Sequence, residues 1–166
     1  MRTTLERWWG LVARLVVGGV WIAAGQAKLP DPSGSVRAVR AYDLLPEGIV
    51  PTVGHTLPIL ELVVGACLVL GLLTRAMSLV SALLFIAFVV GISAAWARGL
   101  QIDCGCFGGG GFDADATSQY PWDIARDLGL LALSVLLVWR PRTPLSLDEL
   151  LFPVDMESLE GQATPT

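Results

Sequence analysis

Charged residues are scarce in this chain. Only 16% of its 166 residues are Asp, Glu, Lys or Arg, whereas an ordinary soluble domain carries about 25%. Hydrophobic residues make up 54% of the sequence, and they gather in long runs. A bilayer crossing takes about 20 mostly apolar helical residues. The composition therefore excludes an ordinary soluble domain. It predicts an integral membrane protein that has the lipid bilayer as a partner.

Cysteine, histidine and clustered basic residues are also scarce. The chain has three cysteines and one histidine, too few for a disulfide scaffold, and the cysteines lack the four-ligand spacing of a structural zinc site. The eleven Lys and Arg residues are scattered singly, so no basic patch of the kind that binds nucleic acid is present. We therefore predict no metal site and no nucleic-acid partner.

Four apolar runs predict an all-α fold, an integral membrane four-helix transmembrane bundle. The expected spans are residues 11–27, 57–73, 77–96 and 122–139. The first run also fits a signal peptide, because a basic start precedes it, but further spans follow and we favour a transmembrane helix. Residues 1–142 then form the membrane domain, and residues 143–166 form a short cytoplasmic tail that is partly disordered.

Local signals predict how the spans begin, turn and pack. Residues 74–76 are expected to form the tight turn between the second and third spans, and Pro58 and Pro121 to mark the starts of the second and fourth. Ser33 or Ser35 is expected to cap a short helix on the membrane surface. Small residues on the spans predict close helix packing; they are Gly18, Gly19, Ala23, Ser78, Ser81, Ala82, Gly91 and Ala95.

The distribution of basic residues predicts the orientation of the four spans. Both termini would lie on one side of the membrane and the two long loops on the other. The terminal side carries five basic residues, and the side of the long loops carries Lys28, Arg37, Arg40 and Arg98. Because cytoplasmic segments are enriched in Lys and Arg, we assign the termini to the cytoplasm. The long loops then face the exoplasmic compartment, where disulfides persist.

The most specific local feature is Cys104-Gly105-Cys106, followed after one residue by four glycines. Two cysteines separated by one residue close a small, strained ring, and strain makes a disulfide readily exchangeable. This favours Cys104 and Cys106 as catalytic redox residues. Two alternatives stay open: idle or structural thiols, and half of a metal site completed by Asp103 or His55.

Glu61 lies inside the second span, near the end that faces the long loops. An intramembrane carboxylate is costly and is a functional candidate by default. Its natural partner is Lys28, at the matching end of the first span. A structural ion pair is one interpretation. The other is a proton relay or a hydrogen bond to a quinone head group, which makes Glu61 and Lys28 the candidate cofactor-binding residues and quinone the candidate cofactor.

Other polar and reactive residues receive structural interpretations. Cys67 is expected to be a small buried hydrophobe, and His55 a solvated loop residue. Asp123 and Arg126 are expected to pair with each other or with Arg98.

Four segments together carry a resemblance to a known family: Ala-Gly-Gln-Ala-Lys-Leu at 24–29, Arg-Ala-Tyr-Asp-Leu-Leu-Pro at 40–46, Leu-Pro-Ile-Leu-Glu-Leu at 57–62 and Asp-Cys-Gly-Cys-Phe-Gly at 103–108. In these the chain resembles the MauE (methylamine utilisation) branch of the DoxX-like integral membrane proteins, over about residues 11–140.

The resemblance implies a four-helix bacterial membrane protein that serves disulfide formation or maturation of exported proteins, beside a thioredoxin-like partner. DoxX-like relatives include subunits of quinone-coupled thiosulfate oxidation. Our leading hypothesis is a membrane thiol-disulfide oxidoreductase that exchanges electrons between an exoplasmic thioredoxin-like or exported redox protein and the quinone pool. The alternative is a non-catalytic anchor or assembly subunit of an exported redox complex, so whether the chain is an enzyme is left open. The residues themselves show no link to methylamine metabolism.

Overall fold

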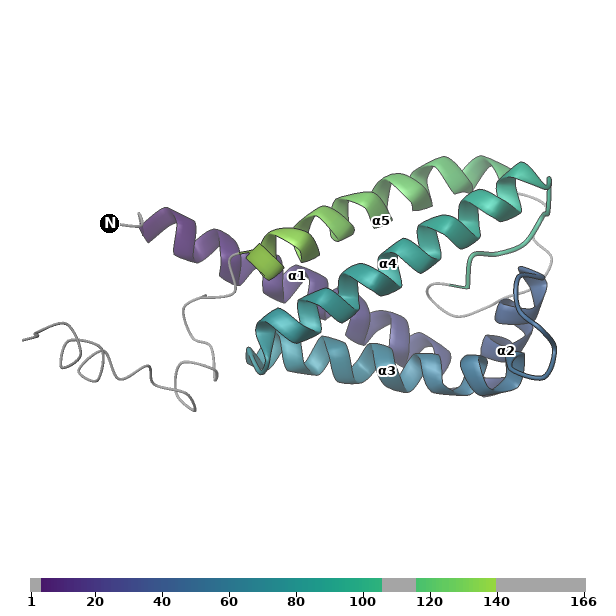
Figure 1. Ribbon diagram of the computed structural model, residues 1–166, viewed down its shortest axis with the longest axis horizontal. Coiled ribbons are helices and arrows are strands. Elements are labelled where there is room, and N and C mark those ends of the chain that lie inside the picture. Colours follow the sequence, from purple (N-terminus) through teal and green to yellow (C-terminus); the bar gives the residue numbers. More distant parts are fainter. Residues whose placement is uncertain (1–3, 106–115, 140–166) are drawn as a thin grey trace, which may run out of the picture.

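The computed structural model describes residues 4–105 and 116–139. In that part of the chain it shows five helices: α1 (Thr4–Lys28), α2 (Pro32–Ala41), α3 (Val50–Leu70), α4 (Thr74–Ala97) and α5 (Ala116–Trp139). Four of them run lengthwise through the molecule, and the short α2 lies at one end, beside the start of α3 (Figure 1). The stretch that leaves α4 lies at the same end, which we call the loop end. The all-helical fold predicted from the sequence is confirmed.

Three helices are long and apolar enough to cross a membrane, as judged by length and composition. They are residues 8–28 of α1, the whole of α3 and the whole of α4. The helix α5 has 24 residues, as many as α4, but it is not one of these candidates. Its first half carries Asp123, Arg126 and Asp127. The predicted bundle of four spans is therefore supported for three of them.

Two prolines that were expected to start helices lie inside them instead. Pro58 is in the interior of α3, which begins at Val50, and Pro121 is in the interior of α5, which begins at Ala116. Each proline removes one backbone donor, a loss that membrane helices tolerate where neighbouring helices surround the backbone. The first-turn proline of α3 is Pro51. The helices consequently extend further toward the loop end than the hydrophobic runs indicate.

The turn between α3 and α4 also differs from the prediction. It lies at Gly71–Leu73 rather than at residues 74–76, which already belong to α4. Gly71 adopts a left-handed conformation with φ of 72°, and its amide donates to carbonyls of the preceding turn. Glycine favours this helix end because it has no Cβ to clash there.

The short helix α2 is capped by Asp31, not by either of the predicted serines. The Asp31 carboxylate accepts a hydrogen bond from the backbone N–H of Gly34 at 2.9 Å, and Ser33 donates its hydroxyl to the same carboxylate at 2.5 Å. The hydrogen bonds from Ser33 and Gly34 lower the pKa of Asp31 to about 2. An ionised cap therefore holds α2 at every physiological pH.

Glycines let the backbones of α1 and α3 touch. A Cβ atom on Gly18 would lie 2.9 Å from the carbonyl oxygen of Gly65, and one on Gly65 would lie 2.8 Å from that of Gly18. Such contacts hold helices together in lipid, where the hydrophobic effect between helices is absent. The prediction of close packing is confirmed at Gly18 and wrong at Gly19, where an added Cβ would meet nothing within 4 Å.

A chain of hydrogen bonds joins α1, α4 and α5 at mid-height. The indole N–H of Trp21 donates to Ser81 at 2.7 Å, the Ser81 and Ser134 hydroxyls lie 3.0 Å apart, and Ser134 donates to the carbonyl of Leu130 at 2.9 Å. Since each hydroxyl has one proton, Ser81 must be the donor to Ser134. These hydrogen bonds lie within an apolar core, which consists of Val17, Trp21, Val64, Leu68, Phe85 and Leu130.

Replacing Gly18 by Ala should destabilise the bundle, whereas replacing its neighbour Gly19 should not. The methyl group at position 18 would force α1 away from α3. Overpacking of this kind lowers the free energy of unfolding by about 1–3 kcal/mol. Tryptophan fluorescence of the two purified variants during heating measures the difference. Equal unfolding midpoints for Gly18→Ala and Gly19→Ala would contradict the close packing described above.

Candidate functional site

Lys28 and Glu61 form a buried ion pair between α1 and α3. The Lys28 ammonium donates to Glu61 Oε1 at 2.5 Å, and the two side chains are only 4% and 0% exposed. Helical side chains lean toward the N-terminus of their own helix, so the antiparallel α1 and α3 direct these two toward each other. The pairing predicted from the sequence is present, while its role toward a quinone stays a prediction.

The helix contact next to this pair fixes its geometry. Gly25 precedes Lys28 by one turn, and a Cβ on it would lie 2.9 Å from the carbonyl oxygen of Pro58. Pro58 in turn precedes Glu61 by one turn. The Lys28 ammonium also lies 5.5 Å from the centre of the Phe88 ring, within range of a cation–π interaction. Glu61 Oε2 has no hydrogen-bond partner among the described residues.

A second ion cluster lies on α5. Arg126 contacts Asp123 at 3.1 Å and Asp127 at 3.0 Å. Asp127 is 2% exposed, and its Oδ2 lacks a hydrogen-bond partner in the described part of the chain. The expected pairing of Asp123 with Arg126 is present. Asp127 was missed, although its position well inside the predicted 122–139 span is itself a functional signal.

A small cleft lies beside Arg126 and Asp127, and Phe88 connects it to the Lys28–Glu61 pair. Residues of three helices line it: Val20, Trp21 and Ala24 of α1, Phe85 and Phe88 of α4, and Arg126 and Asp127 of α5. Phe88 is shared, because Lys28 lies over its ring. The charge of Lys28 acts on the Asp127 carboxyl less than the charges of Arg126 and Asp123 do. We call the residues of the two clusters together the charged cluster: Lys28, Glu61, Asp123, Arg126 and Asp127.

Two tyrosines fix the stretch that carries Cys104. The Tyr120 hydroxyl donates toward the carbonyl of Ile102 at 2.9 Å and accepts from its N–H at 3.2 Å. The Tyr42 hydroxyl donates to the carbonyl of Cys104 at 2.8 Å. Neither role could be predicted from the sequence, because a tyrosine near a helix end is also an ordinary interfacial residue. Tyr42 follows α2 and Tyr120 belongs to α5, so the stretch is held between these two helices.

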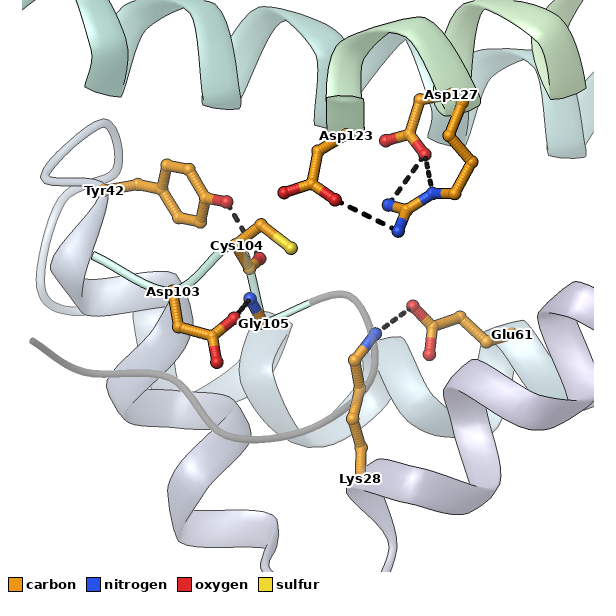
Figure 2. A network of polar contacts seen from close by, with 9 residues as sticks. Lys28, Tyr42, Glu61, Asp103, Cys104, Gly105, Asp123 and Asp127 are labelled. Atoms are coloured by element: carbon orange, nitrogen blue, oxygen red, sulfur yellow. Dashed lines mark hydrogen bonds and ion pairs between the residues drawn. The ribbon is translucent and has the colours of Figure 1, made fainter. Parts of the chain in front are cut away.

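Gly105 completes this attachment. Its backbone has φ of 64°, a conformation that favours glycine, and its N–H donates to Asp103 Oδ1 at 2.8 Å. An added Cβ would lie 2.8 Å from that of Ala38 in α2. Figure 2 shows the Cys104 sulfur directed toward the side on which the charged cluster lies. Cys106 lies outside the described residues, so its place beside Cys104 stays a prediction.

The remaining candidates do not join this site. His55 is exposed on α3, and its Nδ1 lies 2.6 Å from the carbonyl oxygen of Pro51. Cys67 is half-buried rather than fully buried. Arg98 donates to the backbone carbonyls of Tyr42 and Asp43 instead of pairing with Asp123. In residues 4–105 and 116–139 no three His, Cys, Asp or Glu side chains come together as metal ligands.

Buried ion pairs inside long helices, with large apolar side chains on the outer surface, define a helical membrane protein. The chain belongs to the MauE family, because the model of the methylamine utilisation protein MauE matches residues 6–140. The family suggests a membrane protein in methylamine utilisation, and the predicted MauE resemblance is confirmed. The wider kinship with DoxX-like proteins stays a prediction. No curated protein matches the chain. No solved structure matches it either.

Removing one member of the Lys28–Glu61 pair should cost more than removing both. A buried charge that loses its partner destabilises a protein by about 3–5 kcal/mol, whereas replacing both charges with neutral groups is often nearly neutral. We expect Lys28→Met and Glu61→Gln each to lower the midpoint of thermal unfolding, and the double variant to recover much of the loss. Additive losses would show that the two residues are not coupled.

Proposed function

We propose that this MauE-family protein is a membrane thiol-disulfide redox protein that works through Cys104 and Cys106. The observation that carries the proposal is the placement of Cys104. A hydrogen bond from Tyr42 holds its backbone at the loop end of the bundle, and its sulfur is directed toward the side on which the charged cluster lies (Figure 2). Cations near a thiol favour the thiolate that carries out exchange, and Lys28 and Arg126 are the cations of that cluster.

The exchange step conserves bonds and electrons. A thiolate of the partner attacks one sulfur of the Cys104–Cys106 disulfide and forms a mixed disulfide, and the second partner thiolate then displaces the chain's cysteine. The partner is oxidised by two electrons and the Cys104–Cys106 pair is reduced to the dithiol. The same sequence in reverse reduces a partner disulfide. An exported thioredoxin-like protein has the pair of exposed thiols that this step needs.

We propose that a quinone head group binds beside Lys28 and Glu61. The Lys28 ammonium is a donor for a quinone oxygen, and aromatic side chains line the neighbouring cleft. A bound quinone would supply a two-electron acceptor for the dithiol. Lys28 and Glu61 would hold and orient its head group, and Phe85, Phe88 and Trp21 would keep water from it. The charged cluster would thus lie between the Cys104 thiol and the membrane.

The proposed topology has four spans with cytoplasmic termini and an exoplasmic Cys104–Cys106 loop. In α5, Trp122 and Trp139 are both exposed, and the helix between them is about 25 Å long at 1.5 Å per residue. Tryptophans at both ends of a helix are typical of a span that ends at the two membrane interfaces. The pairing of Arg126 with Asp123 and Asp127 lowers the cost of placing these charges in a membrane helix.

Replacing Cys104 and Cys106 together by Ser should abolish thiol oxidation by a soluble quinone analogue, and replacing Cys67 should not. Purified protein is reduced and desalted, and the analogue is added. The remaining thiols are then counted by alkylation shift. Cys67→Ser is the matched control because it lies on α3, away from the Cys104 stretch. A purified wild-type protein whose thiols the quinone leaves reduced would favour a non-catalytic anchor instead.

Labelling with a membrane-impermeant maleimide should find the Cys104 loop outside and positions 75 and 142 inside. Cys104 is kept as the single cysteine in one protein, and Arg75→Cys or Arg142→Cys is introduced into cysteine-free protein. In spheroplasts we expect Cys104 to react at once, and the other two positions to react only after lysis. If position 142 reacted like Cys104, α5 would not cross the membrane.

A further inference from the structure

The charged cluster holds more carboxylates than cations. Lys28 and Arg126 face Glu61, Asp123 and Asp127, so one negative charge is in excess when all five are ionised. The groups come from every element around the cleft except α4, which contributes Phe85 and Phe88 and no ionisable side chain. Near the cluster, the Cys104 stretch adds Asp103, which accepts a hydrogen bond from the Gly105 N–H.

Two carboxylate oxygens of the cluster are buried without a hydrogen bond. They are Glu61 Oε2 and Asp127 Oδ2, for which the described residues provide no partner. An ionised carboxylate in such a place loses its hydration without full compensation. A proton on one of the two carboxyls removes the excess charge. The contacts of Lys28 with Glu61 Oε1 and of Arg126 with Asp127 Oδ1 can both persist, although the one to the protonated carboxyl is then a hydrogen bond and no longer an ion pair.

We propose that the charged cluster holds one exchangeable proton, carried by Glu61 or by Asp127, and that this proton site serves the Cys104 thiol. When the thiol is oxidised, the site passes its proton toward the membrane and is refilled by a proton from the thiol, and both transfers reverse when the disulfide is reduced. The second half of this inference rests on the proposed function, whereas the first half does not. It assigns to Asp127, which pairs with Arg126, a function beyond a structural ion pair.

The proton balance of the redox step calls for such a site. Forming the Cys104–Cys106 bond breaks two S–H bonds and releases two electrons and two protons. Both electrons pass to a membrane quinone, which becomes a quinol only when two protons follow. Asp127 borders the cleft, and Lys28, the partner of Glu61, lies over Phe88 of the same cleft. We therefore assign the first proton to these two carboxyls.

Infrared spectroscopy of the purified protein tests whether a carboxyl of the charged cluster is protonated, without any redox reaction. A protonated carboxyl gives a carbonyl band that an ionised carboxylate lacks. We expect the wild-type protein to show this band at neutral pH, and Asp127→Asn and Glu61→Gln each to lose it. The control is Asp43→Asn, because Asp43 is exposed and has φ of 49°, a conformation that Asn tolerates. Absence of the band in the wild-type protein would overturn the proposal.

The pH profile of thiol oxidation tests the use of the proton. We expect Asp127→Asn to slow oxidation by a soluble quinone analogue roughly 100-fold, the loss typical of a missing proton carrier. We also expect its remaining rate to depend on pH differently from the wild-type rate, because the amide at position 127 cannot carry a proton as the carboxyl does. Asp127→Glu should restore the rate and the profile, which a merely structural role does not predict. Asp43→Asn should match the wild type.

The outcomes separate this inference from the proposed function. If Asp127→Asn oxidises like the wild type at every pH while the Cys104→Ser, Cys106→Ser variant is inactive, only the proton site is wrong. If that double cysteine variant keeps full activity, the thiol-disulfide function itself fails. Measuring the pH profile of thiol oxidation again with choline in place of sodium shows whether the cluster binds a proton or an alkali cation. A rate that depends on sodium rather than on pH would show that the cluster holds an alkali cation, and would overturn the proposal.

Discussion

A lipid-embedded helix cannot leave a charge unpaired, and the ion pair of Lys28 with Glu61 is where this constraint acts on α1 and α3. Each side chain would be expensive to bury alone. Together they require the two helices to lie close and in one register, and the glycine contacts at Gly18, Gly25 and Gly65 supply that closeness. The pair and the contacts depend on each other, since a shift of either helix would separate the charges.

The same constraint explains why the loop end is the most polar part of the structure. Arg126 pairs with two aspartates of α5, and aromatic side chains of α1 and α4 line the cleft beside them. Above this region, Tyr42 and Tyr120 hold the backbone of the Cys104 stretch. A rigid attachment at Cys104 and a charged cluster beneath it therefore occur together at one end of an otherwise apolar bundle.

The sequence predicted the parts of this arrangement that follow from hydrophobicity and charge along the chain. The long helices could be predicted because lipid accepts long apolar runs. The pairing of Lys28 with Glu61 could be predicted because an unpaired charge in lipid is costly. The ends of the helices could not be predicted in this way. Pro58 and Pro121 are typical of the first turn of a helix, but both are tolerated inside packed helices. Gly18 and Gly19 are adjacent and alike in sequence, and only the facing of α1 toward α3 decides which one packs. The attachment of Tyr120 to Ile102 depends on tertiary structure alone.

Asp127 shows how position within a membrane helix changes the meaning of a residue. Read along the chain, it follows Arg126 and resembles one more charge at a helix start. In the structure it lies under the loop end, beside the cleft that Phe88 shares with Lys28. A salt bridge there satisfies one of its oxygens and leaves the other unpaired. Purely structural ion pairs in lipid gain most when every oxygen is satisfied, so this incomplete pairing is better explained by a group that moves between two protonation states.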